Sequence, residues 1–94
     1  MNKRKEKEII DFILGLSERP YYVNEKDFSI ELKKDLDEDY VEIIMFGSYY
    51  INLYSKNDCF DVAYCHSGGY SKQDLEYDAQ IMENKDEIFR ILNN

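Results

Sequence analysis

Residues 28–55 read FSIELKKDLDEDYVEIIMFGSYYINLYS, and this stretch decides the fold. Its first part alternates apolar with polar residues, as a strand with one solvent-exposed face does, although residues 31–36 are also good helix formers. β-branched and aromatic residues dominate the rest, and Gly47–Ser48 marks a tight turn. With the segment that follows, the pattern predicts four strands, at 28–34, 40–46, 49–55 and 59–65. Short connections between strands that are neighbours in sequence predict an antiparallel meander.

Helices are predicted on both sides of this meander. Apolar residues recur at helical spacing near the start of the chain, at positions 9, 12, 13 and 16. Asn2 can cap this helix, and Pro20 prevents its continuation. A second apolar stripe runs from Leu75 to Leu92 and predicts a C-terminal helix, in which Asn84 with Glu87 makes a cap-like pair where the helix can kink.

The chain therefore predicts a single α+β domain over residues 1–94, with an N-terminal helix, a four-stranded antiparallel meander and a C-terminal helix. The helices are expected to form a single layer on one face of the sheet. Alternation then places Tyr50 and Tyr54 on the opposite face from Ile51 and Leu53. Several tyrosines are thus expected near solvent.

The charge of the chain is strongly acidic and unevenly distributed. The net charge is −8, yet residues 1–7 hold four basic residues and one acidic residue, so the remainder carries −11. An acidic body is repelled by nucleic-acid phosphates and by anionic membranes, and it is attracted to basic protein surfaces. We therefore expect neither direct nucleic-acid binding nor membrane binding.

The N-terminal segment has no signal-peptide pattern, because its apolar stretch is interrupted by Asp11 and Gly15. A cytoplasmic location is expected. Cys59 and Cys65 lie on one predicted strand, about 20 Å apart, whereas a disulfide requires Cα atoms within about 7 Å. Reduced thiols are therefore expected.

Patterns that could indicate an enzyme, a cofactor or a metal site are weak. Cys65 and His66 are adjacent, but neighbours on a strand point to opposite faces and do not form a nucleophile–base pair. The segment SGGYSK at 67–72 lacks the spacing of a phosphate-binding loop. The acidic segment 35–39 lacks the glycine and the final glutamate of a calcium-binding loop. We expect no enzymatic activity, no cofactor and no metal.

The remaining candidate is a protein-binding surface made of carboxylates and tyrosines. Its predicted residues are Asp35, Asp37, Glu38, Asp39, Tyr40, Glu42, Tyr49, Tyr50 and Tyr54. Tyrosine is enriched at protein interfaces, and carboxylates can stand where nucleic-acid phosphates would lie in a basic cleft. The ordinary alternative is a solvated acidic turn that only keeps the protein soluble.

In size, charge and order of elements the chain resembles bacterial immunity proteins and phage-encoded inhibitors of CRISPR nucleases, although no sequence motif supports the resemblance. It implies an inhibitor that occludes the cleft of a basic partner, a nuclease or another nucleic-acid-binding protein. The alternative function is a small regulatory or assembly module that pairs through its open sheet face or an edge strand, for example as a homodimer.

Overall fold

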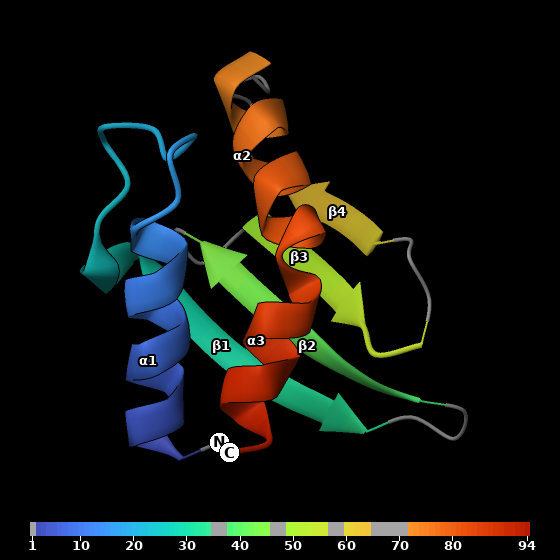
Figure 1. The fold of residues 1–94 in the computed structure, drawn as a ribbon. Coiled ribbons are helices and arrows are strands. Elements are labelled where there is room, and N and C mark those ends of the chain that lie inside the picture. The colour runs from blue at the N-terminus through green and yellow to red at the C-terminus, as the bar shows by residue number, and fades with distance from the viewer. Residues whose placement is uncertain (1, 35–37, 46–48, 57–59, 65–71) are drawn as a thin grey trace.

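The computed structural model describes residues 2–34, 38–45, 49–56, 60–64 and 72–94, and for Tyr49 and residues 60–64 it describes the backbone. Figure 1 shows the elements in chain order. They are α1 (Lys3–Leu14), η1 (Glu25–Asp27), β1 (Phe28–Lys34), β2 (Asp39–Met45), β3 (Tyr49–Tyr54), β4 (Phe60–Tyr64), α2 (Lys72–Glu83) and α3 (Lys85–Leu92). The α+β class, the N-terminal helix and the antiparallel sheet are confirmed.

The strands form one sheet in the order β1-β2-β3-β4, each antiparallel to its neighbours. Residues 28–34 form a strand and not a helix, because the core requires alternate residues: Phe28 and Ile30 are buried while Ser29 and Glu31 are exposed. The apolar residues of adjacent strands meet in register, as in the partners Ile43 and Ile51. This register gives the sheet one continuous apolar face.

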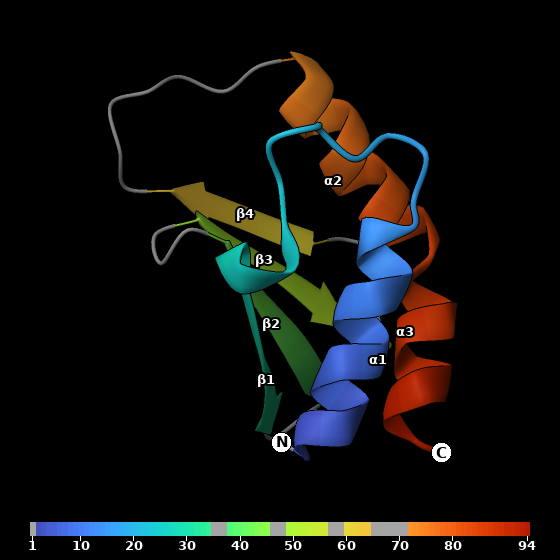
Figure 2. The same ribbon diagram turned by 90° about the vertical axis from the view of Figure 1, so that its left-hand side faces the viewer.

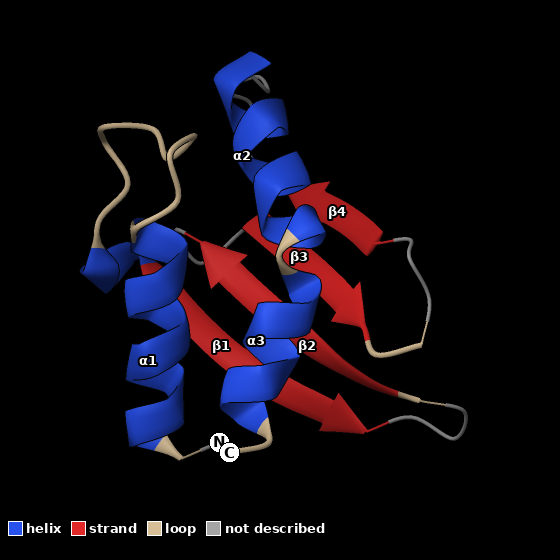
Figure 3. Cartoon of the chain, viewed as in Figure 1, coloured by secondary structure: helices blue, strands red, loops and turns tan. Residues whose placement is uncertain are grey.

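All three α-helices lie on the same side of the sheet, as Figure 2 shows. Figure 3 shows the same separation into a helical layer and a sheet. The core fills the space between the layers. Its buried apolar residues are Ile9, Ile10, Ile13, Val23, Phe28, Ile30, Val41, Ile43, Met45, Ile51, Leu53, Tyr77, Ile81, Ile88, Ile91 and Leu92. None of the α-helices that the structure describes therefore lies over the other face of the sheet.

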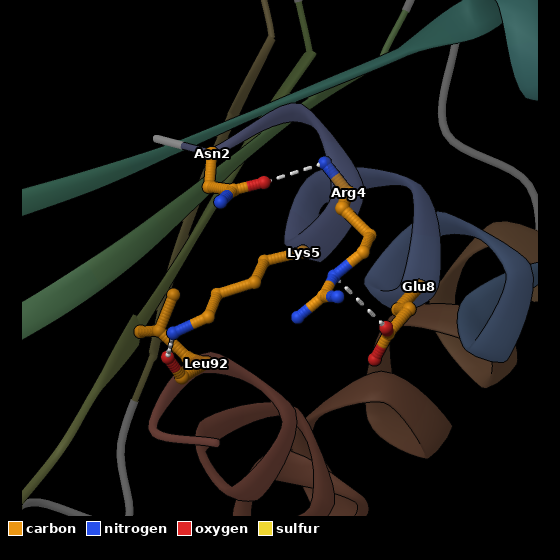
Figure 4. A network of polar contacts seen from close by, with 5 residues as sticks. All are labelled: Asn2, Arg4, Lys5, Glu8 and Leu92. Atoms are coloured by element: carbon orange, nitrogen blue, oxygen red, sulfur yellow. Dashed lines mark hydrogen bonds and ion pairs between the residues drawn. The ribbon is translucent and has the colours of Figure 1, made fainter.

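The N-terminal helix begins as predicted, with the Asn2 side chain accepting a hydrogen bond from the Arg4 backbone N–H at 2.8 Å. It ends at Leu14, several residues before the limit that Pro20 sets. Figure 4 shows that its first turn also reaches the end of α3, where the Lys5 ammonium group donates to the Leu92 carbonyl oxygen at 2.8 Å. A cation at a helix C-terminus is favourable because the last carbonyl groups carry partial negative charge. This contact joins the two ends of the described chain.

The prediction of a single C-terminal helix is wrong, since the segment forms two helices that divide at Asn84. The Asn84 side chain donates to the Gln80 carbonyl at 2.8 Å, and its backbone N–H is shared between the Gln80 and Ile81 carbonyls. This local bonding closes α2, and the Asn84 carbonyl then accepts the first bond of α3 from Glu87. The cap-like pair in the sequence marked the right position.

Several predictions fall outside the described residues. These are Asp35 and Asp37, both cysteines, His66 and the glycine-bearing loop at 66–70. Among the residues that the structure does describe, no helix is long and apolar enough to cross a membrane, and no group of three or more potential metal ligands is found.

Candidate protein-binding surface

The uncovered face of the sheet, which we call the open face, presents alternate residues of the central strands. β2 contributes Tyr40, Glu42 and Ile44, and β3 contributes Tyr50, Asn52 and Tyr54. All six are half-buried. The residues that alternate with them in β2 and β3 are buried in the core, namely Val41, Ile43, Met45, Ile51 and Leu53. The alternation that builds the core therefore also gathers these six side chains on one surface.

Aromatic and apolar side chains pair across the two strands on this face. Tyr40 and Tyr54 are Cα partners in the register, and their ring centroids lie 5.3 Å apart with an interplanar angle of 38°. Ile44 and Tyr50 are partners further along the same strands. Paired aromatic side chains limit one another's movement, so this part of the open face is fixed before any partner binds.

A polar row lies between these two pairs. Glu31, Glu42 and Asn52 are successive register partners across β1, β2 and β3. Like charges directly opposite each other in a sheet are unfavourable. The charge of Glu31 is offset by Lys33 on the same strand, whose ammonium nitrogen lies 2.8 Å from the Glu31 carboxylate.

The Glu31–Lys33 contact also sets the protonation of both groups. The hydrogen bond from Lys33 lowers the pKa of Glu31, and the same bond raises the pKa of Lys33. Both residues therefore stay charged near neutral pH. Glu42, the register partner of Glu31, is half-buried, and its charge also contributes to the raised pKa of Lys33.

Asn52 stands at the centre of the open face with an unsatisfied atom. Its Oδ1 is buried and accepts no hydrogen bond from the described residues. A buried acceptor without a donor costs about 1–3 kcal/mol. The row therefore retains a polar atom that no described residue satisfies.

The carboxylates at the end of the β2–β3 pair are engaged locally. The Glu38 carboxylate accepts a hydrogen bond from the Lys56 backbone N–H at 2.6 Å. The Asp39 carboxylate lies 3.6 Å from the Lys34 ammonium nitrogen, and the Asp39 carbonyl accepts from the Ser55 N–H. These acids help to close the strand ends, and part of their charge is compensated.

The structure thus places the predicted site residues in two groups. Tyr40, Glu42, Tyr50 and Tyr54 share the open face, while Glu38 and Asp39 lie at its edge, where the strands end. Tyr49 is a backbone partner of Met45 in the register, and its side chain lies outside the described part.

The sequence-based prediction missed Ile44, Asn52 and Glu31 as members of this surface. A two-residue turn at Gly47–Ser48 would pair Tyr50 with Met45 and Tyr54 with Val41, one residue away from the observed partners Ile44 and Tyr40, so the predicted turn would not have identified these partners. Glu31 could not have been found either, because its position depends on the register across the connection between β1 and β2.

No protein-family model, no curated protein and no solved structure matches this chain. The function therefore has to be argued from the surface itself. Half-buried tyrosines beside a half-buried carboxylate suit contact with another protein that supplies hydrogen-bond donors and positive charge.

Proposed function

We propose that the protein binds a basic, nucleic-acid-handling protein through the open face of the sheet and inhibits it by occluding its cleft. The observation that carries the proposal is the paired arrangement of Tyr40 and Tyr54 beside Glu42, on a chain of net charge −8. The tyrosines supply a large contact area at low entropic cost, and the carboxylate pairs with lysine or arginine of the target.

Long-range charge supports the same proposal. A strongly acidic protein is steered toward a basic cleft, and such steering weakens as salt screens it. Because Lys34 lies beside the Asp39 carboxylate and the Glu38 carboxylate accepts from the Lys56 N–H, the proposed contact centres on the tyrosines and Glu42 rather than on the acidic strand ends. The target class is the one implied by the resemblance to immunity proteins and to inhibitors of CRISPR nucleases.

A second candidate function rests on the sheet edges. In the order β1-β2-β3-β4, β1 and β4 each have a strand neighbour on one side, and an edge strand can pair with another chain. This candidate is the regulatory or assembly module, with acidity serving only solubility. It predicts concentration-dependent self-association and little effect of salt.

The proposal is tested by affinity capture with the purified protein at about 50 mM and about 500 mM NaCl, a range over which screening becomes strong. A basic nucleic-acid-binding partner is expected at low salt and is then purified for measurement of affinity. Glu42→Gln and Tyr54→Ser should each weaken its binding about tenfold, the effect of losing an interface hot spot.

The matched control is Glu83→Gln, which removes one negative charge from an exposed position on α2, in the helical layer. It should leave the affinity nearly unchanged. Equal weakening by Glu42→Gln and Glu83→Gln would show that only total charge matters and would remove the open face from the proposal. Self-association without any basic partner, measured by sedimentation, would favour the assembly module instead.

A further inference from the structure

A second group of exposed side chains lies at the end of the molecule where α1 ends and α2 begins. Tyr21 is 88% exposed, Tyr22 is 42% exposed and Leu75 is 54% exposed, and these are the exposed large hydrophobic residues of the described chain. The rings of Tyr21 and Tyr22 meet edge to face, with centroids 5.5 Å apart. We call Tyr21, Tyr22 and Leu75 the end patch.

Parts of the end patch come from distant segments that one hydrogen bond joins. The Tyr22 hydroxyl donates to the Asp74 carboxylate at 2.6 Å, which holds the loop after α1 against the first turn of α2. Leu75 is the next residue in that turn. Figure 1 shows this loop beside the start of α2, at the opposite end of the molecule from the two chain termini.

The loop that carries the tyrosines is fixed in place. The Gln80 side chain accepts a hydrogen bond from the Glu18 N–H at 2.8 Å and donates to the Ser17 hydroxyl at 2.9 Å. On both sides of the tyrosines, Pro20 and Val23 are buried, and the Val23 N–H donates to the Pro20 carbonyl. Tyr21 is therefore exposed on a loop that internal hydrogen bonds and buried neighbours hold in one conformation. A partner would not have to order this loop on binding.

The charge around the end patch is negative. Residues 18–25 and 72–76, which adjoin the patch residues in sequence, contain four acidic residues and two basic ones. One of these two, Lys72, lies 3.8 Å from Glu76 and is partly compensated by it. A phosphate backbone or an anionic membrane would be repelled by this charge, whereas a lysine- or arginine-bearing protein segment would be attracted.

We propose that the end patch is a docking surface for a basic segment of another protein, with a lysine or arginine over the Tyr21 ring and apolar contact at Leu75. A cation over an aromatic ring is attracted by the negative face of the ring, and the surrounding carboxylates complement its charge. This inference does not rest on the function proposed above, because its residues come from the helical layer and the α1–η1 loop and not from the open face.

The test is a nuclear magnetic resonance titration of the whole protein with a defined probe, a peptide of alternating arginine and leucine. The amide signals of residues 18–25 and 72–80 are expected to shift. Tyr21→Ala should raise the dissociation constant about tenfold. It should not unfold the protein, because the Tyr21 side chain is almost wholly exposed. Gln80→Ala should also weaken binding, because it removes the hydrogen bonds that hold the loop while Tyr21, Tyr22 and Leu75 themselves are unchanged.

Two controls make the outcome decisive. Tyr54→Ala removes a tyrosine from the open face and should leave peptide binding at the end patch unchanged. A peptide with glutamate in place of arginine should not shift the same signals. Binding that survives Tyr21→Ala, shifts confined to other residues, or equal binding of the glutamate peptide would each overturn the proposal. Self-association abolished by Tyr21→Ala would overturn it as well, since the occupant would then be a second copy of this chain.

Discussion

Tyr77 illustrates how a single residue links two helices. Its ring is buried in the core, and its hydroxyl donates to the Ile13 carbonyl at 2.9 Å, in the last turn of α1. Burial of the ring raises the pKa of the Tyr77 hydroxyl above its usual value near 10. The folded protein therefore keeps this proton at a pH at which the unfolded chain has lost it.

The sign of the resulting pH dependence follows. Above about pH 10 the unfolded state binds fewer protons at this site than the folded state, so the free energy of unfolding falls as the pH rises. Tyr77→Phe should cost about 1 kcal/mol at pH 7, through loss of the hydrogen bond. About one pH unit above 10, the free energy of unfolding of this variant should equal that of the native protein, because phenylalanine does not ionise and the native protein has lost stability through Tyr77. Urea denaturation at the two pH values measures the difference in free energy of unfolding between the native protein and the variant. A difference of equal size at both pH values would contradict the prediction.

At the scale of elements, local pattern predicted much of the fold. Alternation identified β1, and β-branched and aromatic residues identified the strands that follow it. Alternation also placed Tyr50 and Tyr54 on the open face. The division of the C-terminal segment at Asn84 depended on one side chain competing for the Gln80 carbonyl, and the sequence showed only a place where a kink could occur.

The hydrogen bonds between Gln80 of α2 and the residues Ser17 and Glu18, which we call the tether, could not be predicted from the sequence. Gln80 is 62 positions from Glu18, and nothing local distinguishes it from the exposed Gln73 on the same helix. For the same reason the end patch was missed: the loop that carries Tyr21 and Tyr22 lies against the first turn of α2 only through hydrogen bonds such as that from Tyr22 to Asp74.

This tether is expected to contribute measurably to stability. Gln80→Ala should lower the free energy of unfolding by about 1–2 kcal/mol, since two hydrogen bonds are lost. The exchange of the Glu18 amide hydrogen should become faster, because that N–H loses its acceptor. Gln73→Ala is the matched control and should change neither quantity. Unaltered exchange at Glu18 in the Gln80 variant would argue against the tether.

For the molecule as a whole, excess negative charge opposes compaction. The chain has 20 acidic and 12 basic residues, and ion pairs among the described residues, such as Arg4–Glu8 and Lys7–Asp11, lie at exposed positions where each contributes little. Repulsion among the acids is therefore expected to outweigh these pairs.

Raising NaCl from about 10 mM to about 150 mM shortens the Debye length from about 30 Å to about 8 Å and should stabilise the protein by on the order of 1 kcal/mol. The urea midpoint at each salt concentration measures the effect. A midpoint that falls with salt would mean that attractive pairs dominate the electrostatics of the fold.

The candidate site was predicted only in part, for reasons that apply at this largest scale. Strand alternation is a local property, so it correctly grouped Tyr40 with Glu42. The compensation of Asp39 by Lys34 and the central position of Asn52 arise from pairing between strands. The sequence therefore suggested that the acidic segment carries uncompensated charge, whereas its described residues Glu38 and Asp39 have local partners.

The bond between Lys5 and Leu92 has a consequence for how the chain is made. The sheet joins neighbours along the chain, so its hairpins can form as soon as each strand leaves the ribosome. The apolar side of α1 packs against α3, however, and Lys5 and Leu92 are 87 positions apart. During synthesis part of the apolar surface of α1 is therefore expected to stay uncovered, and open to aggregation and proteases, until α3 has emerged from the ribosome.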